Sequence, residues 1–210
     1  MQKAGDKNIP EMGCFADKTQ VDICALKAKR QRRLHKKNKK FLARKRHGFI
    51  LAVHDESIFT YEAKLRHVWA VKGSKPRMIV TGSHRRSVVS GVIAEDGTQL
   101  FRQYKDCDSV AFLNFLKVLL RKYKYLVLFI DRAPWHREGN VQMYIRKNKH
   151  RLKIRWFPIG FPESNPMEEC WNQGKDEVLG STFYDSFLDF KTAITNYYRT
   201  RRFKLDLYKY

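Results

Sequence analysis

Two segments of this chain are apolar almost without interruption and then reach an acidic residue. The first is FILAVHDES at Phe49–Ser57, in which five apolar residues lead to His54 and Asp55. The second is YLVLFID, which is apolar up to its last residue, Asp131. A continuous apolar run is typical of a strand that is buried on both faces, whereas a strand with one face in water alternates. The two segments therefore predict inner strands of a sheet that is covered on both faces.

Strands and helices alternate around these two segments. Further strands are predicted at 77–83, 87–94, 98–104 and 152–158. Apolar residues at helical spacing predict helices at 108–123, 140–149, from Pro166 onward and at 184–203. Asp108 is expected to cap the first of these helices, and Glu95–Gly97 is expected to form a hairpin turn.

This order predicts an α/β fold with a ribonuclease-H-like mixed sheet and helices on both faces. The chain opens with a hairpin-type set of strands and continues with a helix between each later strand. A more general α+β arrangement is the alternative. At 210 residues, the chain suits one domain with a short appendage.

The charge of the chain indicates a polyanionic partner. Lys and Arg number 43 against 21 Asp and Glu, which gives a net charge of +22. Neutralisation of phosphates favours binding to nucleic acid, although a ribosomal or membrane-surface protein is an alternative. Residues 1–47 hold 15 Lys and Arg against 4 acids. They are predicted to form a basic linker or helix ahead of a folded domain at 48–210, either touching a nucleic-acid backbone or simply solvated.

Cysteine usage and hydropathy narrow the class of protein. The four cysteines form no C-x-x-C pair and lie at no zinc-ligand spacing from histidines, so a structural zinc site is not expected. No apolar run approaches the ~20 residues that a membrane helix needs. A soluble protein of a reducing compartment, with no membrane partner, is therefore expected.

Three acids stand where an active site could form. Asp55 follows the apolar run of the first strand, Asp131 ends the second, and Glu168 lies in the first turn of the helix that begins at Pro166. Side-by-side strands would bring the two aspartates together. Carboxylates in such a cluster repel one another unless cations offset the charge, and Mg²⁺ is commonly held by carboxylates together with substrate phosphate. Two such ions suit an in-line phosphoryl transfer.

Each of these acids also has a purely structural interpretation. An aspartate that closes a strand is often a turn residue or a helix cap. For Glu168, Asn165 can serve as N-cap and Pro166 as the first helical residue, which leaves the glutamate to stabilise the helix start. The two interpretations of Glu168 are compatible, because the positive end of a helix favours an ionised carboxylate. Lys175 shares roughly the same helix face and would be able to reach a substrate phosphate.

Three motifs resemble the catalytic domain of DDE transposases of the Tc/mariner superfamily, in particular bacterial and archaeal insertion-sequence enzymes. They are HDES at 54–57, FIDRAPWHR at 129–137 and FPESNPMEECWNQGK at 161–175. HVWAVKGSKP at 67–76 is similar to a further segment of the family. The resemblance covers about residues 41–210, and the 36 residues between Asp131 and Glu168 are a typical family interval.

The resemblance implies a metal-dependent enzyme that acts on DNA. It assigns Asp55, Asp131 and Glu168 as catalytic residues that bind two Mg²⁺ ions, for which Mn²⁺ can substitute. It implies cleavage of phosphodiesters at transposon ends and transfer of the freed 3′-hydroxyl into target DNA, with a homodimer acting on DNA in a prokaryotic cytoplasm, at the nucleoid. His136 and Asn165 would support the site or touch DNA, although a loop histidine with a local hydrogen bond is an equal alternative for His136.

Two features depart from the family pattern. Arg132 stands where many relatives have asparagine, and an arginine there would bind a DNA phosphate or lower the pKa of Asp131. Only about 47 residues precede the core, fewer than the helix-turn-helix modules of full-length relatives need. The chain is therefore expected to be the catalytic portion of a transposase, with a separately encoded helix-turn-helix portion as a possible partner. The alternatives are an inactive, truncated remnant that only binds nucleic acid, or another ribonuclease-H-like nuclease.

Overall fold

The computed structural model describes residues 29, 48–62, 72–73, 77, 82–157, 165–180 and 182–204. The chain divides into two units, Met1–Arg44 and Lys45–Tyr210, and the elements below belong to the second. Of the basic segment predicted at 1–47, only Lys29 in the first unit is described, and it is helical and exposed. Most of the family segment at 67–76 likewise lies outside the described residues.

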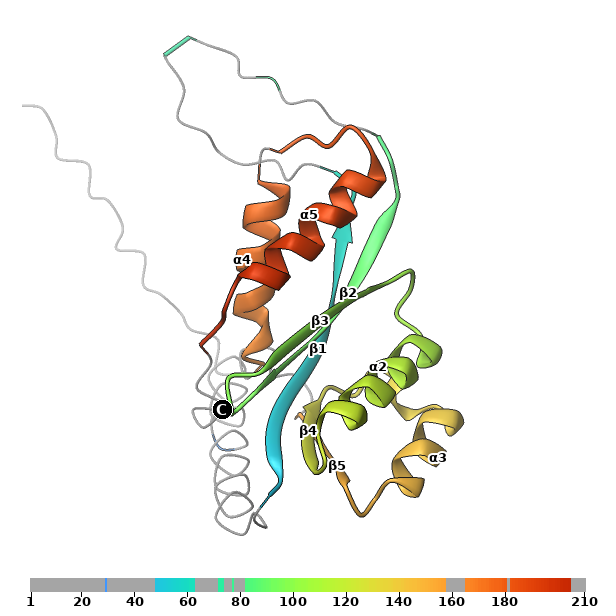
Figure 1. Cartoon of the computed structure of the whole chain (residues 1–210). Helices are drawn as coiled ribbons and strands as arrows, with labels where there is room; N and C mark the ends of the chain where they lie inside the picture. The colour runs from blue at the N-terminus through green and yellow to red at the C-terminus, as the bar shows by residue number, and fades with distance from the viewer. Residues whose placement is uncertain are drawn as a thin grey trace, which may run out of the picture. The chain divides into compact units, whose positions relative to one another are not determined.

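The second unit is built on a five-stranded mixed sheet with the strand order β3-β2-β1-β4-β5 (Figure 1). The strands are β1 (Ile50–Thr60), β2 (Arg86–Ala94), β3 (Gln99–Tyr104), β4 (Leu126–Ile130) and β5 (Leu152–Trp156). β1 pairs antiparallel with β2, and β2 antiparallel with β3. On its other side β1 pairs parallel with β4, and β4 parallel with β5. The two apolar segments are thus neighbouring inner strands, as the sequence predicts.

The hairpin between β2 and β3 follows the predicted turn. Ala94 donates its N–H to the carbonyl of Thr98 over 2.8 Å, and Gly97 adopts a φ of 78°, which favours glycine. The strand predicted at 77–83 lies mostly outside the described residues. Its two described C-terminal members, Gly82 and Ser83, are not in a strand.

The described residues of this unit also form four α-helices and one 3₁₀ helix, of which the first three lie between strands and the last two follow β5. They are α2 (Ser109–Lys122), η1 (Pro134–Arg137), α3 (Gly139–Lys147), α4 (Met167–Leu179) and α5 (Phe187–Thr200). Asp108 caps α2 as predicted, because its Oδ1 accepts the N–H of Ala111 at 2.7 Å. No helix among the described residues is both long and apolar enough to cross a membrane.

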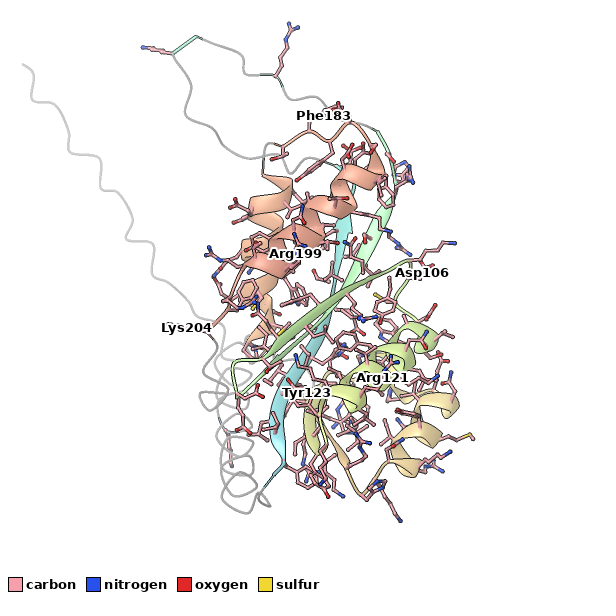
Figure 2. All side chains as sticks on the ribbon, viewed as in Figure 1. Asp106, Arg121, Tyr123, Phe183, Arg199 and Lys204 are labelled. Atoms are coloured by element: carbon pink, nitrogen blue, oxygen red, sulfur yellow. The ribbon has the colours of Figure 1, made fainter. Side chains whose placement is uncertain are left out.

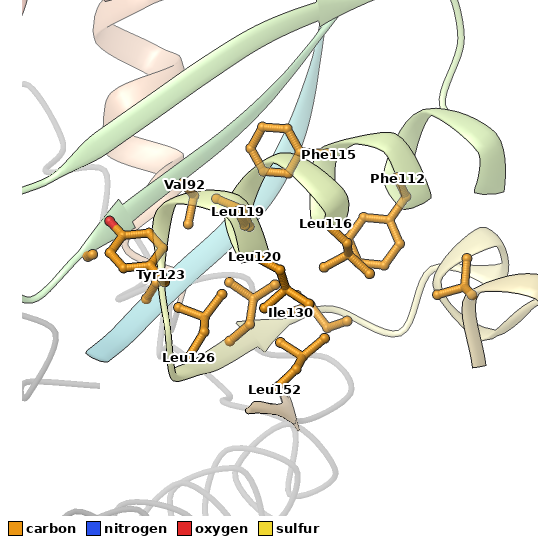
Figure 3. Close-up of a cluster of buried hydrophobic side chains, with 14 residues drawn as sticks. Val92, Phe112, Phe115, Leu116, Leu119, Leu120, Tyr123, Leu126, Ile130 and Leu152 are labelled. Atoms are coloured by element: carbon orange, nitrogen blue, oxygen red, sulfur yellow. The ribbon is translucent and has the colours of Figure 1, made fainter. Parts of the chain in front are cut away.

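One hydrophobic core lies between the sheet and α2. Figure 3 shows Phe112, Leu116 and Leu119 of this helix directed toward Leu126 and Ile130 of β4, and all five are fully buried. Because α2 presents its apolar stripe to the sheet, one face of the inner strands is sealed from water.

A second core lies on the opposite face, beneath α4 and α5 (Figure 1). Val53 of β1 belongs to this core, whereas its neighbour Ala52 belongs to the core beneath α2. Successive strand residues point to opposite faces. Both faces of β1 are therefore covered, which explains why its sequence is apolar without alternation.

Candidate active site

Asp55 lies inside β1, which continues to Thr60, and Asp131 directly follows β4 at the same level of the sheet. In the parallel pairing of β1 with β4, Val53 lies opposite Phe129, and each aspartate follows two residues later. Neighbouring strands lie ~4.8 Å apart, so this register brings the two carboxylates close together. Their mutual repulsion contributes to a raised pKa of Asp55.

Asp55 faces the core beneath α4, because Val53 belongs to this core and residues two apart in a strand point to the same face. Its Oδ2 accepts the indole N–H of Trp171 on α4 at 2.8 Å. Burial, with the charges of Glu56 and Asp131, raises the pKa of Asp55 to about 7, although the Trp171 hydrogen bond opposes the rise. A cation bound close to Asp55 would favour the ionised form of the carboxyl group and so lower its raised pKa.

The absence of a side chain at Gly91 leaves space for the indole of Trp171. This glycine lies opposite Asp55 in the pairing of β1 with β2. A Cβ at position 91 would lie 2.6 Å from the Trp171 ring and 2.6 Å from the Phe101 ring, closer than real Cβ contacts allow. The missing side chain therefore lets the indole lie against the sheet and reach Asp55.

Asp131 is bound by groups of the segment that follows it in the chain. Its Oδ1 accepts the N–H of Ala133 at 3.0 Å and lies 2.8 Å from Nδ1 of His136 in η1. Partial burial works against ionisation of Asp131, but the hydrogen bonds from His136 and Ala133 outweigh it and lower its pKa. The side chain is 48% exposed, so the carboxylate is anchored and still open to solvent.

A buried cluster of His54, Glu56 and His136 lies next to Asp131, on the α2 side of β1. Nε2 of His136 lies 3.1 Å from Oε1 of Glu56, and Nε2 of His54 lies 3.7 Å from the same oxygen. Within the described part of the chain, this trio is the one set of three possible metal ligands whose atoms all lie within 4.8 Å of one another. Glu56 was not predicted as a site residue. Successive strand residues point to opposite faces, so its place directly after Asp55 directs its side chain to the α2 side of β1.

The electrostatics of this cluster centre on His136. Burial works against its charge, but Asp131 and Glu56 outweigh burial and raise the pKa of His136 to about 9. Glu56 has a lowered pKa despite its burial, because His54 and His136 favour its charge. Burial lowers the pKa of His54 to about 4, so this ring is neutral at pH 7.

Glu168 lies in the first turn of α4, with its side chain exposed. Asn165 Oδ1 accepts the N–H of Met167 at 3.1 Å, and Pro166 has a helical φ of −66° and ψ of −13°. α4 begins at Met167, one residue later than predicted, and Pro166 takes the cap position expected of Asn165. The Asn165 side chain nevertheless accepts an N–H of the first turn, as a capping side chain does. Glu168 precedes Trp171 by three residues and so shares its helix face, but the three carboxylates do not all converge within 4.8 Å in the described structure.

The residues predicted to touch nucleic acid occupy different environments. Arg132 is exposed, and its Nε–H points to the carbonyl of Phe157 at 3.4 Å. Lys175 is half-buried, with Nζ 5.9 Å from the centre of the Phe59 ring. His136 is 0% exposed, and its nitrogens face Asp131 and Glu56, so its ring presents no accessible edge to a nucleic acid.

A family model described as DDE superfamily endonuclease matches residues 51–191 of this chain. The chain belongs to this family. The match begins in β1 and ends in α5, so it includes Asp55, Asp131 and Glu168. No match to a curated protein is found.

Solved structures confirm the ribonuclease-H-like fold of this DDE-family chain. The Mos1 transposase paired-end complex with left transposon end is 14% identical, with a TM-score of 0.60 over 99% of this chain. The Mos1 mariner paired end complex with Mn is 15% identical, with a TM-score of 0.58 and the same coverage. The chain spans 61% of the length of each of these two proteins.

The catalytic domain of Mos1 mariner transposase is closer in length to this DDE-family chain than the two proteins above. It is 12% identical, with a TM-score of 0.58, and the alignment covers 85% of this chain and 82% of that domain. The described sheet and helices therefore have the same fold as that domain.

Proposed function

We propose that this chain is the catalytic portion of a DNA transposase that cuts phosphodiesters at transposon ends and joins the freed 3′-hydroxyl to target DNA. The observation that carries the proposal is the register of β1 with β4, which sets Asp55 level with Asp131. The Trp171 bond to Asp55 brings α4, the helix that bears Glu168, to the same strand. Membership of an endonuclease family and the fold of the Mos1 catalytic domain support it.

Asp55, Asp131 and Glu168 are the proposed ligands of two Mg²⁺ ions, with Mn²⁺ as a substitute. The fit rests on the donor set, because all three offer carboxylate oxygens, the ligands that these hard cations prefer. Asp55 is buried beside other carboxylates, and among the described residues no cationic side chain acts on its pKa. When bound, such ions would activate the attacking water or 3′-hydroxyl and stabilise the leaving oxygen of an in-line displacement.

The protein's own residues supply position and charge. Trp171 and His136 each hold an oxygen of one aspartate. Arg132 follows Asp131 directly and Lys175 lies two turns along α4 from Glu168, so we assign both to contacts with DNA phosphates next to the site. Exposed cations also extend from the helices on both faces of the sheet, such as Arg121 of α2 and Arg199 of α5 (Figure 2).

The proposed partners are transposon-end DNA and target DNA. The net charge of +22 supports a polyanionic partner, and phosphate neutralisation supplies sequence-independent affinity. We further propose that the basic segment 1–47 links the catalytic domain at 48–210 to a separately encoded helix-turn-helix portion, and that the enzyme acts as a homodimer. A prokaryotic cytoplasm, at the nucleoid, is the proposed location.

The test uses duplex oligonucleotides that carry the inverted repeats flanking the gene, incubated with the full chain and Mg²⁺ or Mn²⁺. We expect metal-dependent nicking at the repeat ends, and transfer of pre-cut ends into plasmid DNA. Asp131→Asn and Glu168→Gln should each abolish both reactions while leaving the chain folded and able to bind DNA. Cleavage that persists in either variant would show that the proposed site is wrong. Salt-dependent DNA binding without any cleavage in the unmodified chain would mean that it only binds nucleic acid.

A further inference from the structure

Each aspartate of the proposed site has one carboxylate oxygen in contact with a neighbouring side chain, and the two side chains come from opposite faces of the sheet. Trp171 reaches Oδ2 of Asp55 from the α4 side. His136 reaches Oδ1 of Asp131 from the α2 side, where it is backed by Glu56. Oδ2 of Asp131 accepts no hydrogen bond from the described residues, so this oxygen is left for a ligand.

Trp171 is itself fixed in place. Its side chain is 4% exposed and lies against Gly91. The rings of Phe101 and Tyr198 stand edge-on to the indole, each with its centre 5.7 Å from the indole centre. A side chain enclosed in this way cannot change rotamer without displacing its neighbours, so its N–H is directed at Asp55 before any ligand arrives.

His136 is fixed by a comparable enclosure. The centre of the Phe112 ring lies 4.1 Å from the imidazole centre. Nδ1 of the imidazole faces Asp131, and Nε2 lies 3.1 Å from Oε1 of Glu56 and 3.1 Å from the indole nitrogen of Trp135. Glu56 is 7% exposed, so the contact between its Oε1 and Nε2 of His136 is sheltered from water. A hydrogen bond in such surroundings is stronger than one at the surface, and it sets the orientation of the ring.

We propose that Trp171 and the Glu56–His136 pair are positioning residues, which hold Asp55 and Asp131 in the orientation that binds divalent cations. This inference rests on the proposed function, since it concerns the same carboxylates. Groups that orient metal ligands in this manner typically change metal affinity or activity by 10- to 100-fold when they are removed. Neither Trp171 nor Glu56 touches the reacting atoms in this scheme.

A metal ion held by His54, Glu56 and His136 would be a different explanation of the same cluster. A three-ligand metal site needs a further donor, usually water. His54 and His136 are both 0% exposed, and His54 lies between the rings of Phe112 and Phe115, with centres 5.1 and 4.9 Å away. These aromatic neighbours offer no donor. Oδ1 of Asp131 lies next to the trio but is already taken by the N–H of Ala133 and by Nδ1 of His136, so the geometry favours the positioning role.

The experiment measures Mn²⁺ affinity by titration calorimetry in the full chain, alongside metal-dependent DNA cleavage and thermal unfolding. Trp171→Phe removes the N–H but keeps a ring against Gly91, and we expect 10- to 100-fold weaker Mn²⁺ binding. Glu56→Ala should weaken binding to a similar extent, and Glu56→Gln should restore part of it because an amide oxygen still accepts from His136. Trp156→Phe on β5 is the matched control, because Trp156 contacts neither aspartate in the described hydrogen bonds.

The outcomes separate the two proposals. If the unmodified chain binds Mn²⁺ and cleaves DNA while Trp171→Phe and Glu56→Ala stay within twofold of it, the positioning role is overturned. If the unmodified chain neither binds Mn²⁺ nor cleaves DNA, the proposed function itself fails. If a triple variant Asp55→Asn, Asp131→Asn, Glu168→Gln keeps one bound metal that His54→Ala removes, the buried trio is a metal site and the positioning role is overturned. Should Trp171→Phe fail to fold, the Glu56 variants decide.

Discussion

Trp171 and Asp55, 116 residues apart in the chain, are joined by a hydrogen bond of 2.8 Å from the indole N–H to Oδ2. This bond connects α4 to the central strand β1. Glu168, the third acid of the proposed site, lies about one helical turn before Trp171. Its position therefore depends on how the Trp171 indole packs against β1 and β2. Substitutions of residues that contact the Trp171 indole should therefore affect both stability and activity.

Gly91→Ala is expected to destabilise the protein and reduce DNA cleavage. The new Cβ would lie 2.6 Å from the Trp171 ring and from the Phe101 ring, which must shift to make room. Overpacking of this kind costs ~1–3 kcal/mol of unfolding free energy. Urea unfolding measures this loss, and Gly139→Ala is the control because nothing lies within 4 Å of a Cβ at that position. A variant as stable and active as the unmodified chain would contradict this account of Gly91.

Asn165→Ala is expected to lower the unfolding free energy by ~1 kcal/mol. Its Oδ1 accepts the N–H of Met167 at the start of α4, and no other side chain takes over this bond in the alanine variant. The exposed Asn172, in the middle of the same helix, provides the control. Asn172→Ala should be neutral or slightly stabilising, because alanine is the better helix former. Equal losses from both substitutions would show that capping is not what Asn165 contributes.

Mn²⁺ is expected to raise the melting temperature of the unmodified chain. A ligand that binds only the folded state at 100 times its Kd stabilises that state by ~2.7 kcal/mol. Asp131→Asn should remove most of this effect when each protein is compared with itself in EDTA. The melting temperature of the variant in EDTA should itself be lower, because the charge that faces Nδ1 of His136 is lost. Differential scanning calorimetry with and without Mn²⁺ makes the comparison. Equal stabilisation of both proteins would place the ion elsewhere.

The contribution of His136 to stability should depend on pH. Its pKa rises from 6.5 to about 9 on folding, because Asp131 and Glu56 face its nitrogens and outweigh burial and the neighbouring His54. A raised folded-state pKa means that the stabilisation is fully present below pH 6.5 and is lost as the pH rises through about 9. The advantage of the unmodified chain over His136→Gln should shrink across this window by on the order of 3 kcal/mol.

Urea unfolding of the two proteins in EDTA, at intervals from pH 6 to pH 10, measures that difference. Asp55 and the cysteines titrate in both proteins, so their contributions largely cancel in the comparison. A difference that stays constant with pH would show that His136 is not held as a cation between the two carboxylates.

Much of the site could be predicted because it depends on local sequence. The apolar runs before Asp55 and Asp131 can be satisfied only by strands covered on both faces, and the sheet places both runs there. The start of α4 is equally local, since an asparagine before a proline supplies a capping side chain and the fixed φ that suits the beginning of a helix.

The partners of the two aspartates could not be predicted in the same way. No periodicity indicates that Gly91, on the antiparallel neighbour β2, must lack a side chain for Trp171 to reach Asp55. Likewise, the contact between Glu56 and His136 joins residues 80 positions apart. Such contacts depend on the register of strands and on which helix covers which face, and several registers are compatible with the same apolar pattern.

The sequence by itself thus determined the inner strands, the helix starts to within a few residues, the excess of positive charge and the element ends that carry Asp131 and Glu168. The prediction that Asp55 also stands at an element end is wrong, because β1 runs on to Thr60. Only the tertiary structure decided that Asp55 and Asp131 lie level on paired strands, that Trp171 and His136 hold them from opposite faces, and that His136 is buried. The physical reason is that strand and helix formation follow from local residue spacing, whereas hydrogen bonds between distant side chains form only after the whole sheet has fixed their relative positions.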